Sequence, residues 1–185
     1  MTQALLIIDI QNDYFPGGAM ELVGSPEAGE QARRLLELFR EKSKPVIHIQ
    51  HIARHQGATF FLPDTHGAEI HTSVTPLVGE TLFQKSHPNS FLETSLLEHL
   101  RENEITQLII VGMMTHMCID TTTRAASDLG FKCLLIHDAC ATKSLTFGNV
   151  TVPAQHVQAS YLAAIDGSFA KVLSTDDMLV TLATS

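Results

Sequence analysis

An unbroken run of apolar residues near the amino terminus, Ala4-Leu5-Leu6-Ile7-Ile8, ends on the carboxylate of Asp9. A strand with one face in water alternates apolar and polar residues, whereas a strand covered on both faces of a parallel sheet is apolar throughout. The run therefore predicts a central strand of a parallel sheet with helices on both sides. The carboxyl ends of such strands are where open α/β sheets bind ligands, which makes Asp9 a candidate site residue.

The same alternation of strand and helix patterns continues along the chain. Further strands are predicted over residues 45–49, 82–85, 107–111, 133–137 and 170–173, with helices over 26–42, 94–104, 116–129 and 153–165 and a last helix from residue 175. Repeated strand-helix alternation predicts a parallel sheet inside a three-layer α/β/α sandwich of Rossmann-like type. The turn-rich stretch 52–80 is expected to shape a pocket, because a loop of that length in a compact domain is usually functional.

Composition narrows the classes of partner. The chain has 185 residues, of which 44% are hydrophobic and 17% charged, and we expect a single domain over residues 1–185. A formal charge of -8 without a basic run argues against nucleic acid and anionic membranes, and favours a small uncharged or cationic substrate. The sequence shows no membrane span or signal peptide, and its three cysteines form no CxxC pair, so we expect free thiols and a cytoplasmic location.

Three reactive residues fall at predicted strand ends. Asp9 follows the first strand, Lys85 ends the third, and Cys118 lies in the first turn of the helix after the fourth. A helix amino terminus and a nearby ammonium stabilise a thiolate, so we expect both to lower the pKa of Cys118, with Asp9 taking the thiol proton. Each residue taken singly also has an ordinary explanation: a buried small side chain for the cysteine, a turn residue for the aspartate and a solvated lysine.

The chain resembles the isochorismatase-like cysteine hydrolases. The resemblance rests on residues 6–15, on Lys85 with 89–91, and on 111–120, and the segments 138–142 and the Pro153 helix agree with it. It implies a six-stranded sheet of order 3-2-1-4-5-6 and a catalytic triad of Asp9, Lys85 and Cys118 with a covalent intermediate on the sulfur. It further implies a cis peptide bond between Met113 and Met114, an oxyanion hole formed by the backbone N–H groups of Met114 and Cys118, and a homo-oligomer.

The substrate-binding residues are less well defined by the sequence. We expect substrate contacts from Gln11, Phe15, Phe60, Phe61, Met113 and His116. The apolar members of this set would serve equally well in core packing. His116 stands where many family members have an aspartate, and both contact with substrate and exposure to solvent remain open for it.

No cofactor or metal is expected. The stretch after the second strand lacks the Asp-x-His spacing of the metal-binding nicotinamidases. Four possible ligands, Asp64, His66, Glu69 and His71, lie close in sequence but without the paired spacing of a metal site.

The leading hypothesis is a cysteine hydrolase that cleaves an amide or another carbon-nitrogen bond of a small molecule. Retention of Cys118 favours it over an isochorismatase-type vinyl ether hydrolase that uses Asp9 as an acid. A third hypothesis is a ligand-binding or redox-sensing protein without catalytic activity, in which Cys118 is the sensing thiol.

Overall fold

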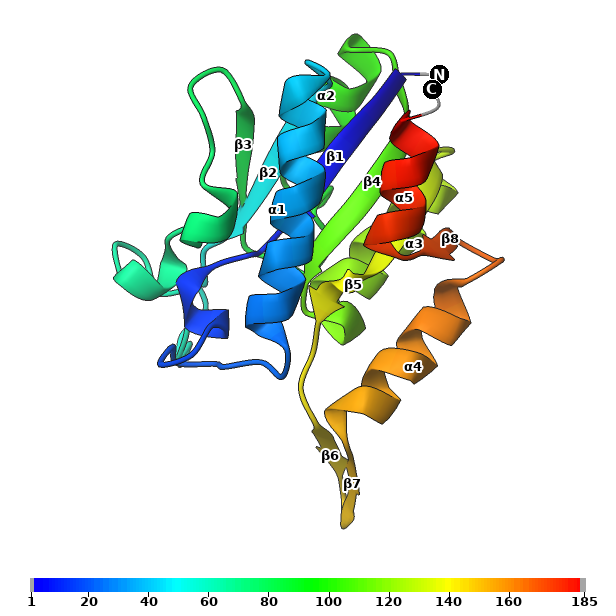
Figure 1. Cartoon of the computed structure of the whole chain (residues 1–185). Coiled ribbons are helices and arrows are strands. Elements are labelled where there is room, and N and C mark those ends of the chain that lie inside the picture. The colour runs from blue at the N-terminus through cyan, green and yellow to red at the C-terminus, as the bar shows by residue number, and fades with distance from the viewer. Residues whose placement is uncertain (1, 184–185) are drawn as a thin grey trace.

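A computed structural model describes residues 2–183 of the chain. Its centre is a sheet of six parallel strands in the order β3-β2-β1-β4-β5-β8 (Figure 1). The strands are β1 (Thr2–Ile8), β2 (Val46–His51), β3 (Thr81–Lys85), β4 (Ile105–Met113), β5 (Lys132–Ala141) and β8 (Lys171–Leu173). Because β8 is the sixth strand of this sheet along the chain, the predicted order 3-2-1-4-5-6 is confirmed.

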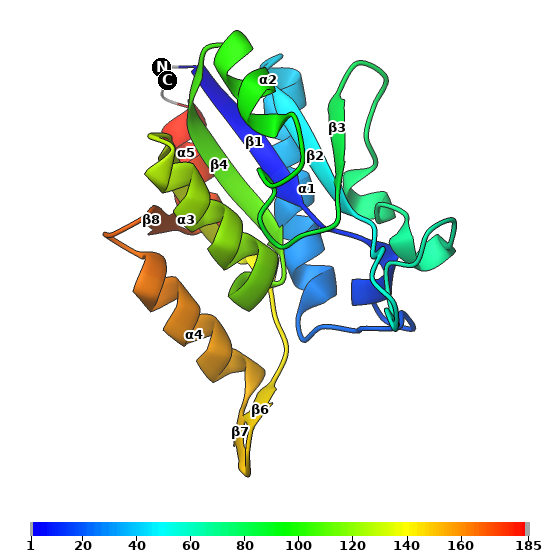
Figure 2. The same cartoon turned by 180° about the vertical axis from the view of Figure 1, so that it is seen from behind.

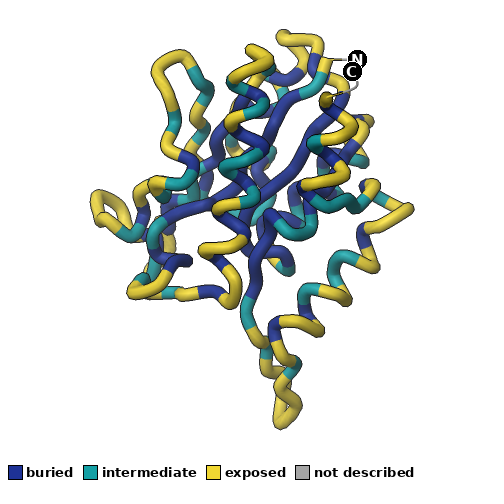
Figure 3. The backbone as a smooth tube through the Cα atoms, in the orientation of Figure 1, coloured by how far each residue is buried: buried dark blue, intermediate teal, exposed yellow. Residues whose placement is uncertain are grey.

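Helices cover both faces of the sheet, as the apolar first strand requires. Helices α1 (Ser25–Glu41) and α5 (Thr175–Ala183) lie on one face, while α2 (Leu96–Glu102), α3 (Asp120–Asp128) and α4 (Ala154–Ile165) lie on the other (Figures 1 and 2). Side chains of β1 alternate between two hydrophobic clusters: Leu5 and Ile7 join the cluster of α1, and Leu6 and Ile8 join that of α2. Figure 3 shows the strands as the buried centre of the molecule.

The predicted helix over residues 116–129 is wrong at its start. Residues Thr115–Ile119 form a π-helical turn, η4, and α3 begins only at Asp120. The turn is closed by a hydrogen bond of 3.3 Å from the N–H of Ile119 to the carbonyl of Met114, five residues earlier. Turns of this kind are rare, and they occur often at functional sites.

Two further differences concern segments between the main elements. Residues 145–152 form an antiparallel hairpin of β6 (Leu145–Phe147) and β7 (Val150–Val152), which projects from the body of the molecule (Figure 1). Its strands of three residues are too short to show a periodic pattern. The stretch 52–80, expected as a loop, contains the short 3-10 helices η2 (His66–Ala68) and η3 (Thr72–Val74), and another, η1 (Asn12–Tyr14), follows β1.

A close approach of two backbones defines the end of β4. Gly112 has φ +130°, and a Cβ atom at this position would lie 1.9 Å from the carbonyl oxygen of Ile8. Only glycine fits here without displacing β1. The peptide bond between the two following residues, Met113 and Met114, is cis, and the chain then enters η4.

Within the part of the chain that the structure describes, none of the helices has the length and apolar character needed to cross a membrane.

Candidate active site

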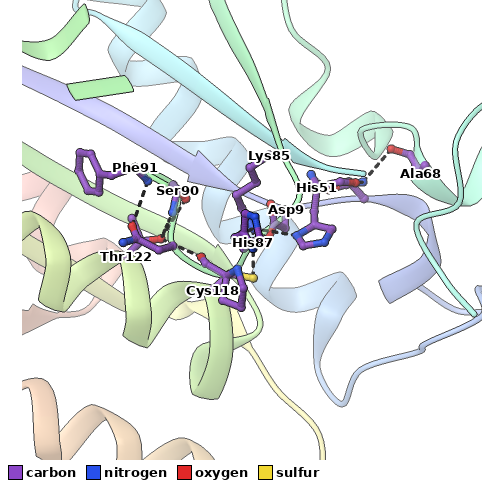
Figure 4. Close-up of polar contacts among 12 residues, drawn as sticks. Asp9, His51, Ala68, Lys85, His87, Ser90, Phe91, Cys118 and Thr122 are labelled. Atoms are coloured by element: carbon purple, nitrogen blue, oxygen red, sulfur yellow. Dashed lines mark hydrogen bonds and ion pairs between the residues drawn. The ribbon is translucent and has the colours of Figure 1, made fainter. Parts of the chain in front are cut away.

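Asp9, Lys85 and Cys118 come together at the carboxyl edge of the sheet (Figure 4). Asp9 follows β1 directly, and its φ of 52° turns the chain out of the strand. Lys85 is the last residue of β3, which is separated from β1 by β2. The lysine nevertheless reaches across the intervening strand, and its Nζ lies 2.7 Å from Oδ2 of Asp9. Both side chains are fully buried.

The Lys85 ammonium is the hub of the site. Besides Asp9, its Nζ contacts Nδ1 of His51 at 3.0 Å, the carbonyl oxygen of His87 at 3.1 Å and Sγ of Cys118 at 3.2 Å. Burial acts to lower the pKa of Lys85, but the neighbouring Asp9 and Cys118 outweigh it and the pKa is raised. Lys85 is therefore a permanent cation at neutral pH.

The pKa of the Cys118 thiol is raised. Burial raises its pKa most, the negative charge of Asp9 raises it further, and Lys85 acts in the opposite direction without cancelling these effects. The expectation that Lys85 and the helix terminus would leave the thiol with a lowered pKa is wrong, because it took no account of burial or of the adjacent carboxylate. A thiolate here requires that its proton be removed at the moment of reaction.

A proton acceptor for this thiol is available in Asp9. Oδ2 of Asp9 is used by Lys85, whereas Oδ1 is buried and has no hydrogen-bond partner among residues 2–183. A carboxylate oxygen of Asp9, Sγ of Cys118 and a ring nitrogen of His51 all lie within 4.8 Å of one another. An unsatisfied buried acceptor is unusual in a folded protein and often marks a catalytic group.

A cavity of about 200 Å³ opens onto Cys118. Besides Cys118, its walls carry Phe60 and Phe61, which were expected to contact substrate, and Met114 of the expected oxyanion hole, with several residues that the sequence did not single out. The full lining is Tyr14, His51, His55, Phe60, Phe61, Ser86, Pro88, Met114, Met117 and Cys118. A larger cavity of about 540 Å³ lies elsewhere, along β5 and β8, and holds none of the Asp9 cluster. The reactive side chains in the lining therefore identify the site better than the volume of the cavity does.

Four residues expected to contact substrate lie outside the cavity lining. The buried amide of Gln11 bonds to the backbone of His51 and Ala68. Phe15 stacks on the ring of His71 at 3.5 Å, and Met113 is fully buried in the core. His116 accepts or donates a hydrogen bond of 2.6 Å with Thr142 and packs against Tyr161, so it is engaged within the protein. Each of these four side chains makes contacts that hold the fold.

His51 is the residue that sequence reasoning missed. It ends β2 at the same edge of the sheet as Asp9 and Lys85. The predicted second strand stopped at residue 49, two residues short. Had the strand been predicted to its true end, His51 would have been a candidate for the same reason as Lys85, because both lie at the carboxyl end of a strand.

The described residues do not fit a metal centre. His66 pairs with Glu69 at 2.7 Å on the surface, while His71 packs on Phe15, so the four possible ligands between residues 64 and 71 do not converge. Within residues 2–183, the one cluster of suitable ligands is Asp9, His51 and Cys118. The Lys85 ammonium already contacts all three of these groups, and a second cation would meet its charge.

The Rossmann-like sheet carries a buried cysteine, lysine and aspartate at its carboxyl edge, and comparison with known proteins shows the class of protein to which it belongs. The family model for the Isochorismatase domain matches residues 3–177. The isochorismatase family protein YddQ of Bacillus subtilis is 48% identical over 97% of this chain and 99% of its own. The crystal structure of an isochorismatase hydrolase from Oleispira antarctica has a TM-score of 0.92 and 46% identity, covering 97% of this chain and 96% of that one. The chain belongs to the isochorismatase family and is a hydrolase.

An enzyme with a named activity also matches. The nicotinamidase of Escherichia coli is 28% identical, over 75% of this chain and 82% of its own. That name describes hydrolysis of an amide by the relative.

Proposed function

We propose that this hydrolase cleaves the carbon-nitrogen bond of a small-molecule amide, with Cys118 as nucleophile, Asp9 as proton acceptor and donor, and Lys85 as the cation that holds both. The observation that carries the proposal is the contact of one buried ammonium with Asp9 at 2.7 Å and Cys118 at 3.2 Å beside a cavity. A nucleophile next to an oriented base is the arrangement that covalent catalysis needs.

The reaction begins with transfer of the thiol proton of Cys118 to Oδ1 of Asp9, the carboxylate oxygen without a partner among the described residues. The resulting thiolate attacks the amide carbon, and the carbonyl oxygen becomes an oxyanion. We assign its stabilisation to the backbone N–H groups of Met114 and Cys118. Asp9 then returns the proton to the leaving nitrogen as the carbon-nitrogen bond breaks.

Hydrolysis of the thioester completes the cycle. Asp9, again a carboxylate, takes a proton from water, the hydroxide attacks the acyl carbon, and the sulfur leaves to regain a proton from Asp9. Lys85 stays charged throughout, because its raised pKa keeps the proton on Nζ. Its role is to hold Asp9 in place and to balance the negative charge that passes between carboxylate and sulfur.

The cavity favours a small and uncharged substrate. Its volume of about 200 Å³ is below the range of about 300–1,000 Å³ that drug-sized ligands occupy. Phe60, Phe61, Met114 and Met117 give it apolar walls, and none of its lining residues is an acid, a lysine or an arginine. A charged group on the substrate would be buried there without a partner.

The test is ammonia release from a panel of small primary amides. The native chain should turn over at least one of them, and Cys118→Ala should lower kcat by about 10³-fold or more. Cys133→Ala is the matched control, since Cys133 is also a buried thiol but bonds to the carbonyls of Phe131 and Thr123 in another part of the fold. Equal turnover by native and Cys118→Ala chains would remove the cysteine from the mechanism and favour an acid-catalysed cleavage through Asp9.

A further inference from the structure

His51 is held rigidly in the cavity wall. The side-chain amide of Gln11 accepts a hydrogen bond of 2.7 Å from the His51 backbone N–H and donates one of 2.9 Å to its carbonyl. The ring lies 5.8 Å from that of Phe61 and beside the Asp9 carboxylate (Figure 4). A residue whose backbone and ring are both held in place is suited to making a hydrogen bond in a fixed direction.

The contact with Lys85 determines where the imidazole carries its proton. An ammonium group has only donors, so Nδ1 of His51 must accept in the 3.0 Å contact with Nζ. In a neutral imidazole the other nitrogen then bears the hydrogen. Nε2 of His51 has no hydrogen-bond partner among residues 2–183, and His51 lines the cavity, so its N–H is free for a ligand.

The environment keeps this imidazole neutral. Burial lowers the pKa of His51 to about 4, with smaller contributions in the same direction from Lys85, His87 and His55, while Asp9 opposes them. With Nδ1 engaged by Lys85 and no proton gained at neutral pH, His51 is a poor base for the Cys118 thiol. We therefore look for a role of His51 beside Asp9 and Cys118 other than that of a base.

We infer that His51 is a specificity-determining residue whose Nε2–H donates a hydrogen bond to an acceptor atom of the substrate, in the tautomer that Lys85 imposes. The acceptor is an uncharged oxygen or an aromatic nitrogen, since a donor group or an ammonium of the substrate would meet the N–H unfavourably. That the hydrogen bond goes to a substrate rests on the proposed function. The tautomer of His51 rests on the geometry alone.

The tautomer is tested without any substrate. Long-range ¹⁵N–¹H NMR spectra of the chain labelled at histidine distinguish the two nitrogens, and the signals of His51 are those absent from His51→Gln. We expect a neutral ring with the proton on Nε2 from pH 8 to pH 5. A proton on Nδ1, or a cation already at pH 6, would overturn the inference.

The role is tested by two substitutions that each keep half of the imidazole. His51→Gln keeps an amide N–H near the position of Nε2, whereas His51→Asn keeps an acceptor near Nδ1 and leaves the cavity side without a donor. For the amide that the native chain turns over, His51→Asn should raise KM about 3- to 10-fold with kcat within about twofold, and His51→Gln should stay near the native KM.

Other outcomes separate this inference from the proposed function. A fall in kcat with unchanged KM and loss of the acid limb of the pH profile would make His51 a base, which contradicts the inference and leaves Cys118 as nucleophile. Equal effects of Asn and Gln would indicate a packing role and also contradict it. If no amide is turned over, the proposed function fails, and the NMR spectra still decide the tautomer on which His51 as a donor depends.

Discussion

Strand β3 carries a buried or half-buried ion pair at each end. The two pairs differ in whether they adjoin a reactive side chain. At the carboxyl end, Lys85 pairs with Asp9. Just before the amino end, Glu80 pairs with Arg40 and with the buried His48 of β2. Both clusters tie β3 to its neighbours, yet only the first adjoins the thiol of Cys118 and the cavity that Cys118 lines.

The two carboxylates differ in how fully their oxygens are used. Oε1 of Glu80 accepts from Arg40, and Oε2 accepts from Arg40, His48 and the backbone N–H of Leu77. Burial acts to raise the pKa of Glu80, but these hydrogen bonds and the charge of Arg40 outweigh it and lower the pKa to about 2. Asp9 has Oδ1 left over. A saturated carboxylate is a structural group, whereas one with a spare oxygen beside a thiol can exchange a proton.

The largest expected effect comes from replacing each carboxylate by its amide. Asp9→Asn should lower kcat for amide hydrolysis by about 10² to 10⁴-fold, because the proton acceptor for Cys118 is lost. Asparagine tolerates the positive φ of 52° at this position, so the backbone is preserved. Glu80→Gln is the matched control and should change kcat by less than about twofold. Ammonia release measures both, and a comparable loss in Glu80→Gln would erase the distinction between the clusters.

Stability should separate the two pairs by a smaller amount. Lys85→Met leaves the fully buried Asp9 without its cation and should lower the free energy of unfolding by about 3–5 kcal/mol. Arg40→Met should lower it by about 1–2 kcal/mol, since the Arg40 side chain is 26% exposed and Glu80 keeps its bonds to His48 and Leu77.

Urea unfolding measures both values, and the double variant Asp9→Asn with Lys85→Met provides the control. It removes both charges and should be more stable than Lys85→Met alone. A double variant that is less stable would mean that Asp9 is not destabilised by the loss of Lys85.

The two ends of β3 also differ in how much of their structure could be predicted from the sequence. The layered parallel sheet and the convergence of Asp9 and Cys118 could be predicted from the residues, because an apolar strand requires cover on both faces and residues at strand ends share an edge. The order of the strands was predicted from the resemblance to the family. The reach of Lys85 across β2, the π-helical turn and the raised pKa of Cys118 depend on packing between distant segments, which no local pattern records. The Glu80 cluster left no signal, since Arg40, His48 and Glu80 are separated in sequence and each has an ordinary place in a helix, strand or turn.

The last comparison is the acid dependence of stability, in which Glu80 and His51 should titrate in different pH windows. The pKa of Glu80 in the folded chain is about 2, below its ordinary value of 4.5, so its contribution is complete above about pH 4.5 and is lost as the pH falls toward 2. We expect this contribution to be about 2 kcal/mol.

His51 titrates at higher pH than Glu80. The pKa of His51 is about 4 in the folded chain and ordinarily 6.5, so the unfolded chain gains a proton first and stability falls between pH 6.5 and 4. Urea unfolding of the native chain, Glu80→Gln and His51→Gln from pH 7.5 to 2.5 should show the lower slope reduced in the first variant and the upper slope in the second. A single slope reduced in both variants would show that the two ends of β3 titrate as one unit, and would contradict the separation of a catalytic cluster from a structural one.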